Sequence, residues 1–346
     1  MTFIGALFFT ALVAEIFLRV LNPPMSFPAL KNLTEYSPVL GYKLSPLLRD
    51  RYISTNSHGL RDQEFSLSRP EGIKRILGIG DSFTFGYKVD LDECYLKQLQ
   101  SRLNKNRYRW EVINAGVTGY NMWQYLAYFK HYGYKFEPDI VSIGVYFDDF
   151  YGDPPTIKQP SVHQRYHSLS SVRLNNFIRN TVDLMKIRYR YLFEAKWLRS
   201  IEDRRLYIER TQYNLLLNGS SKEELYDNFE QRLQEFAEIA KERNIYVIVI
   251  FIPDIIQVHN PKFQAVNKAL ESMCRKLEVE FLDITPFFEA IPDIKSLYLL
   301  PHDAHTSPKG HRIIAREVEK RVRKMNIESQ LSRNKIGNSQ RKPVNT

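Results

Sequence analysis

Residues 73–87 read Ile-Lys-Arg-Ile-Leu-Gly-Ile-Gly-Asp-Ser-Phe-Thr-Phe-Gly-Tyr, a short apolar run that ends directly before Gly80-Asp81-Ser82. The run predicts a buried β-strand, and the glycines around the serine let the backbone turn tightly. Open α/β sheets place their reactive groups where parallel strands end. Ser82 is therefore a candidate nucleophile, and the alternative is a serine that only caps the helix after the strand.

Three common motifs do not fit this stretch. A phosphate-binding loop ends in Gly-Lys-Ser or Gly-Lys-Thr, and a dinucleotide fingerprint needs a third glycine where Phe83 stands. The Gly-x-Ser-x-Gly elbow of the α/β-hydrolases is missing too, because Ser82 does not lie between glycines at that spacing. The Ser82 hydroxyl is thus the chemically distinctive group of the stretch.

The composition is that of a globular protein rich in aromatic residues. The chain has 346 residues, enough for one large α/β domain with additions or for two modest domains. The net charge of +10 favours an anionic membrane surface or an anionic glycan as a partner, and no segment resembles a nucleic-acid-binding module. Cys94 and Cys274 are far apart in the chain, which indicates packing residues instead of a disulfide or a metal site.

The N-terminal segment predicts a membrane anchor. Residues 3–21 are apolar except for Glu15 and Arg19, which are four apart and can pair on one helix face. Such a segment is long enough to span a bilayer. The competing interpretation is a cleaved signal peptide, but no Lys or Arg precedes the apolar run and residues 12–14 form a poor cleavage site. We therefore expect an uncleaved anchor at residues 1–22.

From residue 73 onward the pattern alternates between strands and helices. Short apolar runs without strict alternation suit parallel strands buried on both faces, and the helices between them imply right-handed crossovers. A doubly wound sheet is the simplest architecture. The expected strands are 73–79, 110–114, 139–146, 245–252 and 279–282, and the expected helices are about 92–104, 121–135, 222–243, 262–277 and 308–325.

Three further segments fall outside this alternation. Residues 23–72 are rich in Pro, Ser, Asn and Tyr and predict an irregular arm, whose 55–62 piece is interpreted as a loop on the domain surface. Residues 151–220 predict a helical insert, either a lid or binding surface or a solvated excursion with a basic face. Residues 328–346 are polar and basic and predict a disordered tail.

Four polar blocks follow predicted strands or lie in a loop that can reach the same sheet edge. Acyl transfer by a serine needs a hydroxyl, a base, an acid that orients the base, and donors for the oxyanion. His302 and His311 compete with His305 for the role of base on residue type alone, but His311 falls inside the last predicted helix, where a cap or surface role is favoured. The blocks are Gly80-Asp81-Ser82 and residues 114–121, 146–149 and 301–311.

In this order the blocks resemble those of the SGNH (GDSL-type) hydrolase superfamily, over about residues 73–325. The resemblance implies a three-layer α/β/α domain at 73–327 with a mostly parallel, flavodoxin-like five-stranded sheet, and it implies neither a cofactor nor a metal. It further implies that Ser82 is the nucleophile, that His305 is the general base, and that Asp303 orients the imidazole. The backbone N–H groups of Ser82 and Gly119 would be donors to the oxyanion.

The third block departs from the family pattern. The family's side-chain donor to the oxyanion is normally Asn, whereas this chain has Asp148. An ionised carboxylate accepts hydrogen bonds and repels an oxyanion, so Asp148 can serve only when protonated, or another donor such as Asn121 replaces it. A metal site at Asp148 and Asp149 is disfavoured, because the sequence shows no matching carboxylate cluster with recognisable ligand spacing.

The resemblance implies a serine esterase that cleaves acyl esters, expected to be O-acetyl esters of an envelope carbohydrate, through an acyl-serine intermediate. Gly41-Tyr42 and residues 56–62 of the arm look like those of bacterial members with an N-terminal membrane anchor, which implies a catalytic domain on the extracytoplasmic side. One alternative is an O-acyltransferase that passes the acyl group to an envelope polysaccharide. Another is a catalytically weak or inactive glycan-binding or assembly protein, which Asp148 would favour.

Overall fold

The computed structural model describes residues 33–49, 53–106, 109–151, 213–258, 260–300 and 303–339. All of them belong to one of the two compact units of the chain. The predicted anchor at 1–22, most of the predicted insert and His302 lie outside the described residues. Among the helices that are described, none combines the length and the apolar character needed to cross a membrane.

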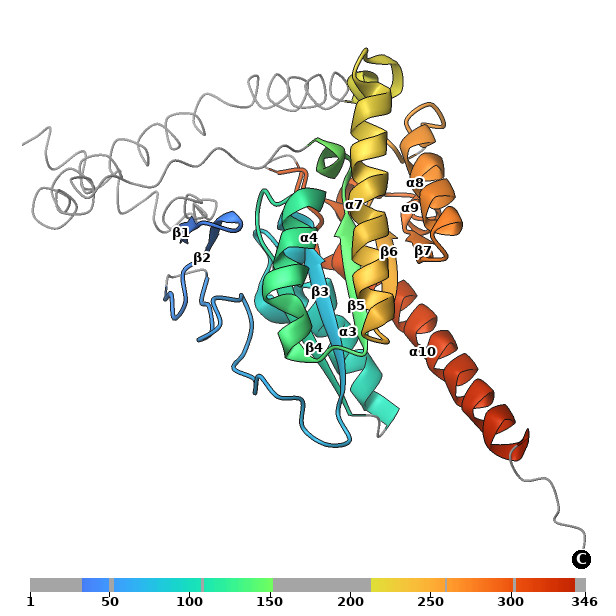
Figure 1. Cartoon of the computed structure of the whole chain (residues 1–346). Coiled ribbons are helices and arrows are strands. Elements are labelled where there is room, and N and C mark those ends of the chain that lie inside the picture. Colours follow the sequence, from blue (N-terminus) through green and yellow to red (C-terminus); the bar gives the residue numbers. More distant parts are fainter. Residues whose placement is uncertain are drawn as a thin grey trace, which may run out of the picture. The chain divides into compact units, whose positions relative to one another are not determined.

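A five-stranded parallel sheet forms the centre of the described unit (Figure 1). The strand order β4-β3-β5-β6-β7 confirms the flavodoxin-like arrangement, and each expected strand lies within two residues of its predicted bounds. Because the order reverses at β3, the carboxyl end of this strand lies at the switch point where such sheets bind their ligands. The strands are β3 (Lys74–Gly80), β4 (Trp110–Gly116), β5 (Ile140–Val145), β6 (Tyr246–Phe251) and β7 (Glu280–Asp283).

Helices cover both faces of the sheet and complete the three layers (Figure 1). Helices α4 and α7 pack together on one face, and α3 and α10 pack together on the other. The long helices are α3 (Tyr95–Leu103), α4 (Met122–His131), α7 (Lys222–Glu242), α8 (Ala265–Lys276) and α10 (Pro308–Ser339). The short ones are α2 (Ser82–Phe85), α9 (Thr285–Glu289) and the 3-10 turns η2 (Leu91–Glu93), η3 (Asn104–Asn106), η4 (Gly133–Phe136), η5 (Phe147–Phe150) and η6 (Ile294–Leu297).

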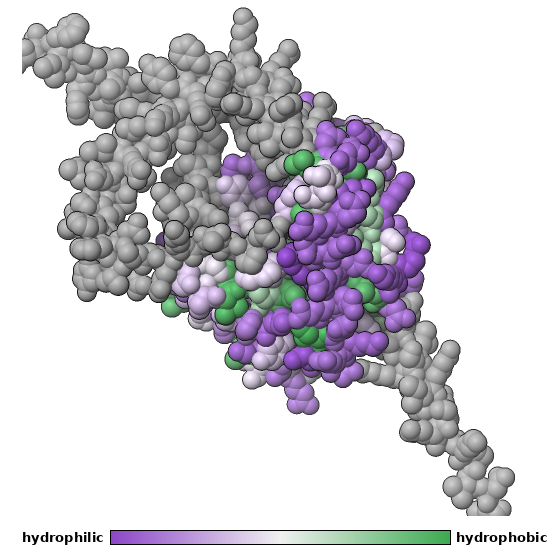
Figure 2. Space-filling view, turned by 45° about the horizontal axis from the view of Figure 1, so that its top comes forward, coloured by the Kyte–Doolittle hydropathy of each residue, from purple (hydrophilic) through white to green (hydrophobic). Residues whose placement is uncertain are grey.

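Helix α7 shows why the helical prediction succeeded. Its buried residues, Phe229, Leu233, Phe236 and Ala240, recur every three or four positions and form one apolar stripe. Phe236 stacks on Phe129 of α4, with ring centroids 4.3 Å apart. The outer positions are charged, and Figure 2 shows a mostly hydrophilic face with small, separate hydrophobic patches.

The arm is more regular than its composition predicts. Strands β1 (Thr34–Ser37) and β2 (Gly41–Leu44) form an antiparallel hairpin, so the prediction of an irregular arm was wrong there. Strands of four residues are too short to show a clear alternation of apolar and polar residues. The 55–62 piece packs closely on the domain: Ser57 and His58 are exposed, whereas Arg61 and Asp62 are only 3% and 7% exposed.

Helix α10 is longer than predicted. It runs to Ser339, so the prediction of a disordered tail was wrong for residues 328–339, and residues 340–346 lie outside the described part. No proline interrupts the chain between Pro308 and Pro343, although residues 328–339 also contain Gly337 and several Ser and Asn residues of low helix propensity. A polar composition by itself does not end a helix that the preceding turns have already nucleated.

Candidate active site

The predicted strand-to-helix turn is confirmed, and Ser82 is the first residue of the short helix α2. The helix cap is Asp81, whose Oδ1 accepts a hydrogen bond from the backbone N–H of Phe83 at 2.9 Å. Helix α2 ends at Gly86, which has a φ of 78°. The capping role considered for Ser82 therefore belongs to its neighbour, and the serine side chain is left to interact with other groups.

Three glycines at the ends of neighbouring strands let α2 lie directly against the sheet. Gly80 pairs with Gly116 in β4 and with Gly144 in β5. A Cβ atom at Gly80 or Gly144 would lie 2.1 or 2.2 Å from Oγ1 of Thr84 in α2, which no real contact permits. The close approach presents Ser82 at the carboxyl edge of the sheet.

Ser82, His305 and Asp303, the three residues that the family resemblance singled out, lie together. Oγ of Ser82 lies 2.7 Å from Nε2 of His305, and Nδ1 of His305 is hydrogen-bonded to Oδ1 of Asp303. The same Oδ1 accepts the backbone N–H of His305 at 2.9 Å, which fixes the carboxylate relative to the ring. With its proton on Nδ1, the imidazole can accept the serine proton at Nε2.

Lys88 is a member of this group that sequence reasoning missed. Its Nζ lies 2.8 Å from Oδ2 of Asp303, the carboxylate oxygen that does not face His305. Burial alone would raise the pKa of Asp303, but the hydrogen bonds and charges of His305 and Lys88 outweigh burial and hold the pKa well below its ordinary value. Asp303 therefore stays ionised and can stabilise an imidazolium.

Aromatic rings also contact the base. The ring of His305 lies 4.6 Å from that of Tyr87 and 4.9 Å from that of Phe83, measured between centroids. Phe83 in turn stacks on Tyr146, at 4.2 Å. These contacts restrict the tilt of the imidazole, so that Nε2 keeps facing the serine.

His311 is structural, and the two cysteines are packing residues as predicted. His311 is fully buried, so a surface role is wrong, and its Nδ1 accepts the backbone N–H of Tyr95 at 3.3 Å. It therefore caps helix α3 from the neighbouring helix α10, and burial lowers its pKa to about 3, which keeps the ring neutral. Cys94 and Cys274 are buried free thiols.

The loop that contains Gly119 is shaped by the arm. Gly119 has a φ of 78°, a conformation that favours glycine, and a Cβ atom there would lie 2.9 Å from the hydroxyl of Tyr42 in β2. The Tyr42 hydroxyl donates to the carbonyl of Thr118 at 2.9 Å, and the Tyr120 hydroxyl donates to the carbonyl of Tyr42 at 2.6 Å. Sequence reasoning missed Tyr42 as a partner of this loop.

The side chain of Asn121 is used elsewhere. Its Oδ1 accepts the backbone N–H groups of Trp123 and Gln124, at 3.0 and 3.3 Å, and so caps helix α4. This capping role fixes the turn before α4 and does not favour Asn121 as a replacement donor for the oxyanion.

Asp148 is exposed and belongs to a group of three carboxylates with Asp81 and Asp149. One ligand oxygen from each lies within 4.8 Å of the others. Asp81 comes from 67 positions earlier in the chain, which explains why sequence spacing showed no matching cluster. Asp149 already accepts hydrogen bonds from the hydroxyl of Tyr125 and the backbone N–H of Tyr146, both at 2.8 Å, and Asp81 caps α2. In the described residues nothing beyond the cluster itself indicates a bound cation.

Close packing of these carboxyls changes their protonation. Burial and the charge of Asp148 raise the pKa of Asp81 to about 8, and burial together with Asp81 raises the pKa of Asp149 well above its ordinary value. Like charges in a buried site cannot all be ionised at low energy. The group therefore retains protons at neutral pH.

Asp81→Asn tests this conclusion through stability. Because the folded-state pKa of Asp81 is raised from 3.8 to about 8, the stability that this carboxyl contributes is full below about pH 4 and is lost as the pH rises through 8. An amide is neutral at every pH. We expect the substitution to raise Tm relative to the wild type by roughly 5 °C more at pH 9 than at pH 5. Thermal unfolding at the two pH values measures the difference, and equal shifts would contradict the raised pKa.

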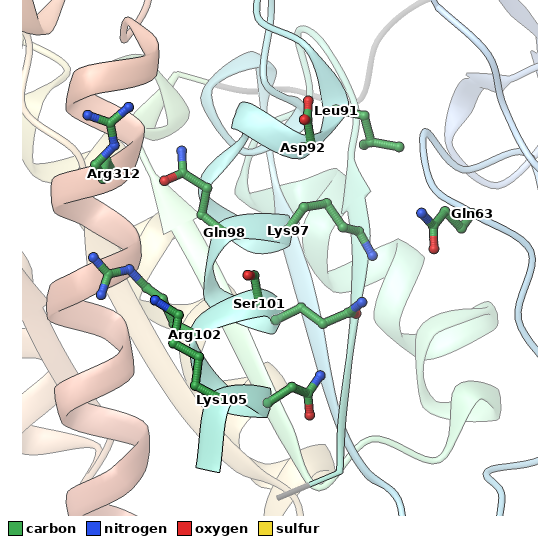
Figure 3. Close-up of a pocket in the computed structure, with 11 residues that line it drawn as sticks. Gln63, Leu91, Asp92, Lys97, Gln98, Ser101, Arg102, Lys105 and Arg312 are labelled. Atoms are coloured by element: carbon green, nitrogen blue, oxygen red, sulfur yellow. The ribbon is translucent and has the colours of Figure 1, made fainter. Parts of the chain in front are cut away.

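Two cavities of the described residues are not lined by Ser82. One of about 740 Å³ lies along α3, and Figure 3 shows Lys97, Gln98, Ser101 and Arg102 projecting from that helix, with Gln63 from the arm and Arg312 from α10. The other, of about 160 Å³, lies between the arm and α4 and is lined in part by Val117 and Tyr120 of the Gly119 loop. Neither cavity is lined by Ser82, Asp303 or His305.

Several solved structures are similar to this chain. One is an acetyl xylan esterase, AlAXEase, with 16% identity and a TM-score of 0.43, covering 72% of this chain and 99% of that one. Another is a lipase/acylhydrolase from Enterococcus faecalis, with 13% identity and a TM-score of 0.43, covering 72% and 96%. A variant of an acetyl-xylooligosaccharide esterase from Geobacillus Stearmophilus has 16% identity and a TM-score of 0.42, covering 71% and 93%. Similarity at this level does not bear on the substrate of this chain, and no curated protein matches it.

A family model gives the stronger result. The model of the GDSL-like lipase/acylhydrolase family matches residues 79–313, which is 235 of the 346 residues. The match begins at the end of β3, includes the turn at Ser82 and the Asp303–His305 loop, and ends in α10. This chain therefore belongs to the GDSL-like lipase/acylhydrolase family of ester hydrolases, within the SGNH superfamily.

Proposed function

We propose that this protein is a serine esterase whose nucleophile is Ser82. The observation that supports it most is the continuous hydrogen-bonded line from Ser82 Oγ through His305 to Asp303, with 2.7 Å between Oγ and Nε2. A hydroxyl in this arrangement can lose its proton to the imidazole as it attacks a carbonyl. The buried carboxylate then stabilises the imidazolium.

The reaction would proceed in two steps. In the first, Oγ of Ser82 bonds to the acyl carbon, its proton moves to Nε2 of His305, and the alcohol leaves with that proton. In the second, His305 removes a proton from water as the water oxygen bonds to the acyl carbon; the bond to Oγ of Ser82 then breaks, Oγ receives the proton from His305, and the acid is released. The backbone N–H groups of Ser82 and Gly119 are the proposed donors to the oxyanion in both steps.

We further propose an acylated envelope carbohydrate as the substrate, with acetate as the acyl group. The resemblance of the arm to that of membrane-anchored bacterial relatives supports this, as does the net charge of +10, which suits an anionic glycan. The same proposal includes a membrane anchor through residues 3–21 and a catalytic domain on the extracytoplasmic side. It also includes the division of the chain into an anchor at 1–22, an arm at 23–72 and an insert at about 151–220.

The competing transferase differs only in the acceptor. The purified protein is incubated with an activated acetyl ester, with and without a bacterial oligosaccharide, and both free acetate and acetylated sugar are measured. The esterase proposal expects free acetate at the same rate in both. Acetylated sugar formed at the expense of acetate would show an O-acyltransferase instead.

Asp148→Asn tests whether the aspartate weakens the oxyanion site. A neutral amide can donate a hydrogen bond to an oxyanion, whereas an ionised carboxylate cannot, so we expect kcat for an activated ester to rise by about 10- to 100-fold. Asp92→Asn, an exposed position in η2, is the control and should leave kcat unchanged. A lower kcat for Asp148→Asn would show that the carboxyl has a role of its own. If neither the wild type nor Asp148→Asn hydrolyses the ester, the glycan-binding alternative is favoured.

A further inference from the structure

Arg61 joins the arm to the nucleophile turn. This arginine is 3% exposed, and its Nη1 donates to the carbonyls of Phe85 and Gly86 at 2.9 and 2.7 Å. Its Nη2 donates to the carbonyl of Val89 at 2.6 Å. One guanidinium thus binds three carbonyls in the segment 85–89, which is where α2 ends and the next loop begins.

The same segment carries the two side chains that touch the acid–base pair from this side. The Tyr87 ring packs against His305, and the Lys88 ammonium forms an ion pair with Asp303. Lys88 has a φ of 61°, a left-handed conformation that residues other than glycine seldom adopt. Such a conformation persists only where the surrounding contacts hold it in place. The carbonyl contacts of Arg61 flank it on both sides.

We propose that Arg61 is a positioning residue of the active site, which holds segment 85–89 so that Lys88 meets Asp303 and Tyr87 meets His305. Arg61 has no contact with the reacting atoms and acts through the segment. The proposal uses the proposed function only to interpret the site, because the contacts exist whatever the substrate is. It makes the arm part of the catalytic unit, in addition to its proposed role as the connection to a membrane anchor.

The substitution Arg61→Lys distinguishes the effect of the hydrogen-bond geometry at position 61 from the effect of its positive charge. It keeps a positive charge, but a single ammonium on a shorter side chain cannot reproduce a planar fork that reaches three carbonyls. The charged and titratable groups around the Asp303–His305 pair come from several elements. Lys88 and Tyr87 belong to segment 85–89, Asp81 precedes α2, and His311 lies in α10. Asp148 of η5 interacts electrostatically with Asp81. Arg61→Lys changes the charge of none of them.

Displacement of Lys88 has a predictable electrostatic result. Its ammonium neutralises part of the Asp303 charge and so opposes protonation of the neighbouring imidazole. Moving the ammonium away favours the imidazolium, which shifts the titration of His305 to higher pH. The acid limb of the kcat/KM profile should shift with it, because the base must be neutral to accept the serine proton.

Arg75 provides a matched control. It is also a fully buried arginine that binds three carbonyls, those of Ser66, Leu67 and Phe136, and it too links the arm to the sheet. It lies near the amino end of β3, away from the carboxyl edge where Ser82 is found. Arg75→Lys therefore reports the general effect of disturbing a buried arginine.

The experiment compares the full-length wild type, Arg61→Lys, Lys88→Met, the double variant and Arg75→Lys. The titration midpoint of His305 is followed by NMR, and kcat/KM for an activated acetyl ester is measured against pH. For Arg61→Lys we expect kcat to fall by about 10-fold and the midpoint to rise by about half a pH unit. Lys88→Met should give the same shift, and the double variant should add nothing to it. Arg75→Lys should lower Tm and leave both quantities unchanged.

Each outcome supports or overturns the proposal. Equal titration in the Arg61→Lys and Arg75→Lys proteins, or additive shifts in the double variant, would overturn it. If Arg61→Lys does not fold, Arg61→Gln is measured in its place, with the same expected direction. If the wild type hydrolyses no ester but the shift in His305 titration is present, the proposed function fails and the positioning role of Arg61 stands. If the wild type hydrolyses esters but Arg61→Lys does not shift the titration of His305, the proposed function stands and the positioning role of Arg61 fails.

Discussion

Ser82→Ala is expected to lower kcat for ester hydrolysis by about 10⁴- to 10⁶-fold. The reason is chemical, since alanine has no atom that can form the acyl intermediate, and the remaining groups can only bind the ester and polarise its carbonyl. The fold should be unaffected, because the serine is not the cap of α2 and the substitution removes a single oxygen atom. Initial rates with an activated acetyl ester, together with labelling by a fluorophosphonate probe, measure the effect.

A neighbouring serine controls for the substitution itself. Ser142 lies in β5, opposite Gly78 of β3, and its hydroxyl has no hydrogen-bond partner among the described residues. Ser142→Ala should therefore keep full activity and full labelling. Turnover by Ser82→Ala within 10-fold of the wild type, or labelling that persists without Ser82, would show that a different nucleophile acts.

Asp303→Asn is expected to lower kcat by about 10⁴-fold while leaving the fold intact. An amide at this position can offer an N–H to Nδ1 of His305, which would put the imidazole proton on Nε2, facing Ser82. The base could then no longer accept the serine proton. The ionic contact with Lys88 would be lost as well, since it depends on the carboxylate charge. Steady-state kinetics at neutral pH give the magnitude.

Asp283 is a suitable control for Asp303. It ends strand β7, and its carboxylate accepts the backbone N–H of Thr285 at 2.8 Å and the side chain of Asn267 at 3.0 Å. Asp283→Asn retains an oxygen for the first of these bonds and contacts none of the three proposed catalytic groups. If Asp303→Asn keeps more than a tenth of the wild-type kcat while Asp283→Asn keeps all of it, His305 does not depend on Asp303 for its orientation.

The sheet and its long helices could be read from the chain because their signals are local. The apolar run 73–79 and the heptad-like spacing of Phe229, Leu233 and Phe236 each describe the environment of a few consecutive residues. The hairpin β1–β2 was missed because strands of four residues contain too few positions to show a period. The end of α10 was missed because residues 328–339 are polar and contain Gly337, and such a composition has no local signal that distinguishes helix from disorder.

The sequence by itself determined which residues are the candidates for the chemistry: Gly80-Asp81-Ser82 at a strand end, and Asp303 and His305 two positions apart before the last helix. Only the tertiary structure decided what supports them. Lys88 meets Asp303 across 215 positions, Tyr42 reaches Thr118 across 76, and Arg61 enters the nucleophile turn from the arm. The physical reason is that residue patterns record whether each position is buried or exposed, whereas a hydrogen bond between distant segments depends on the path of the whole chain between them.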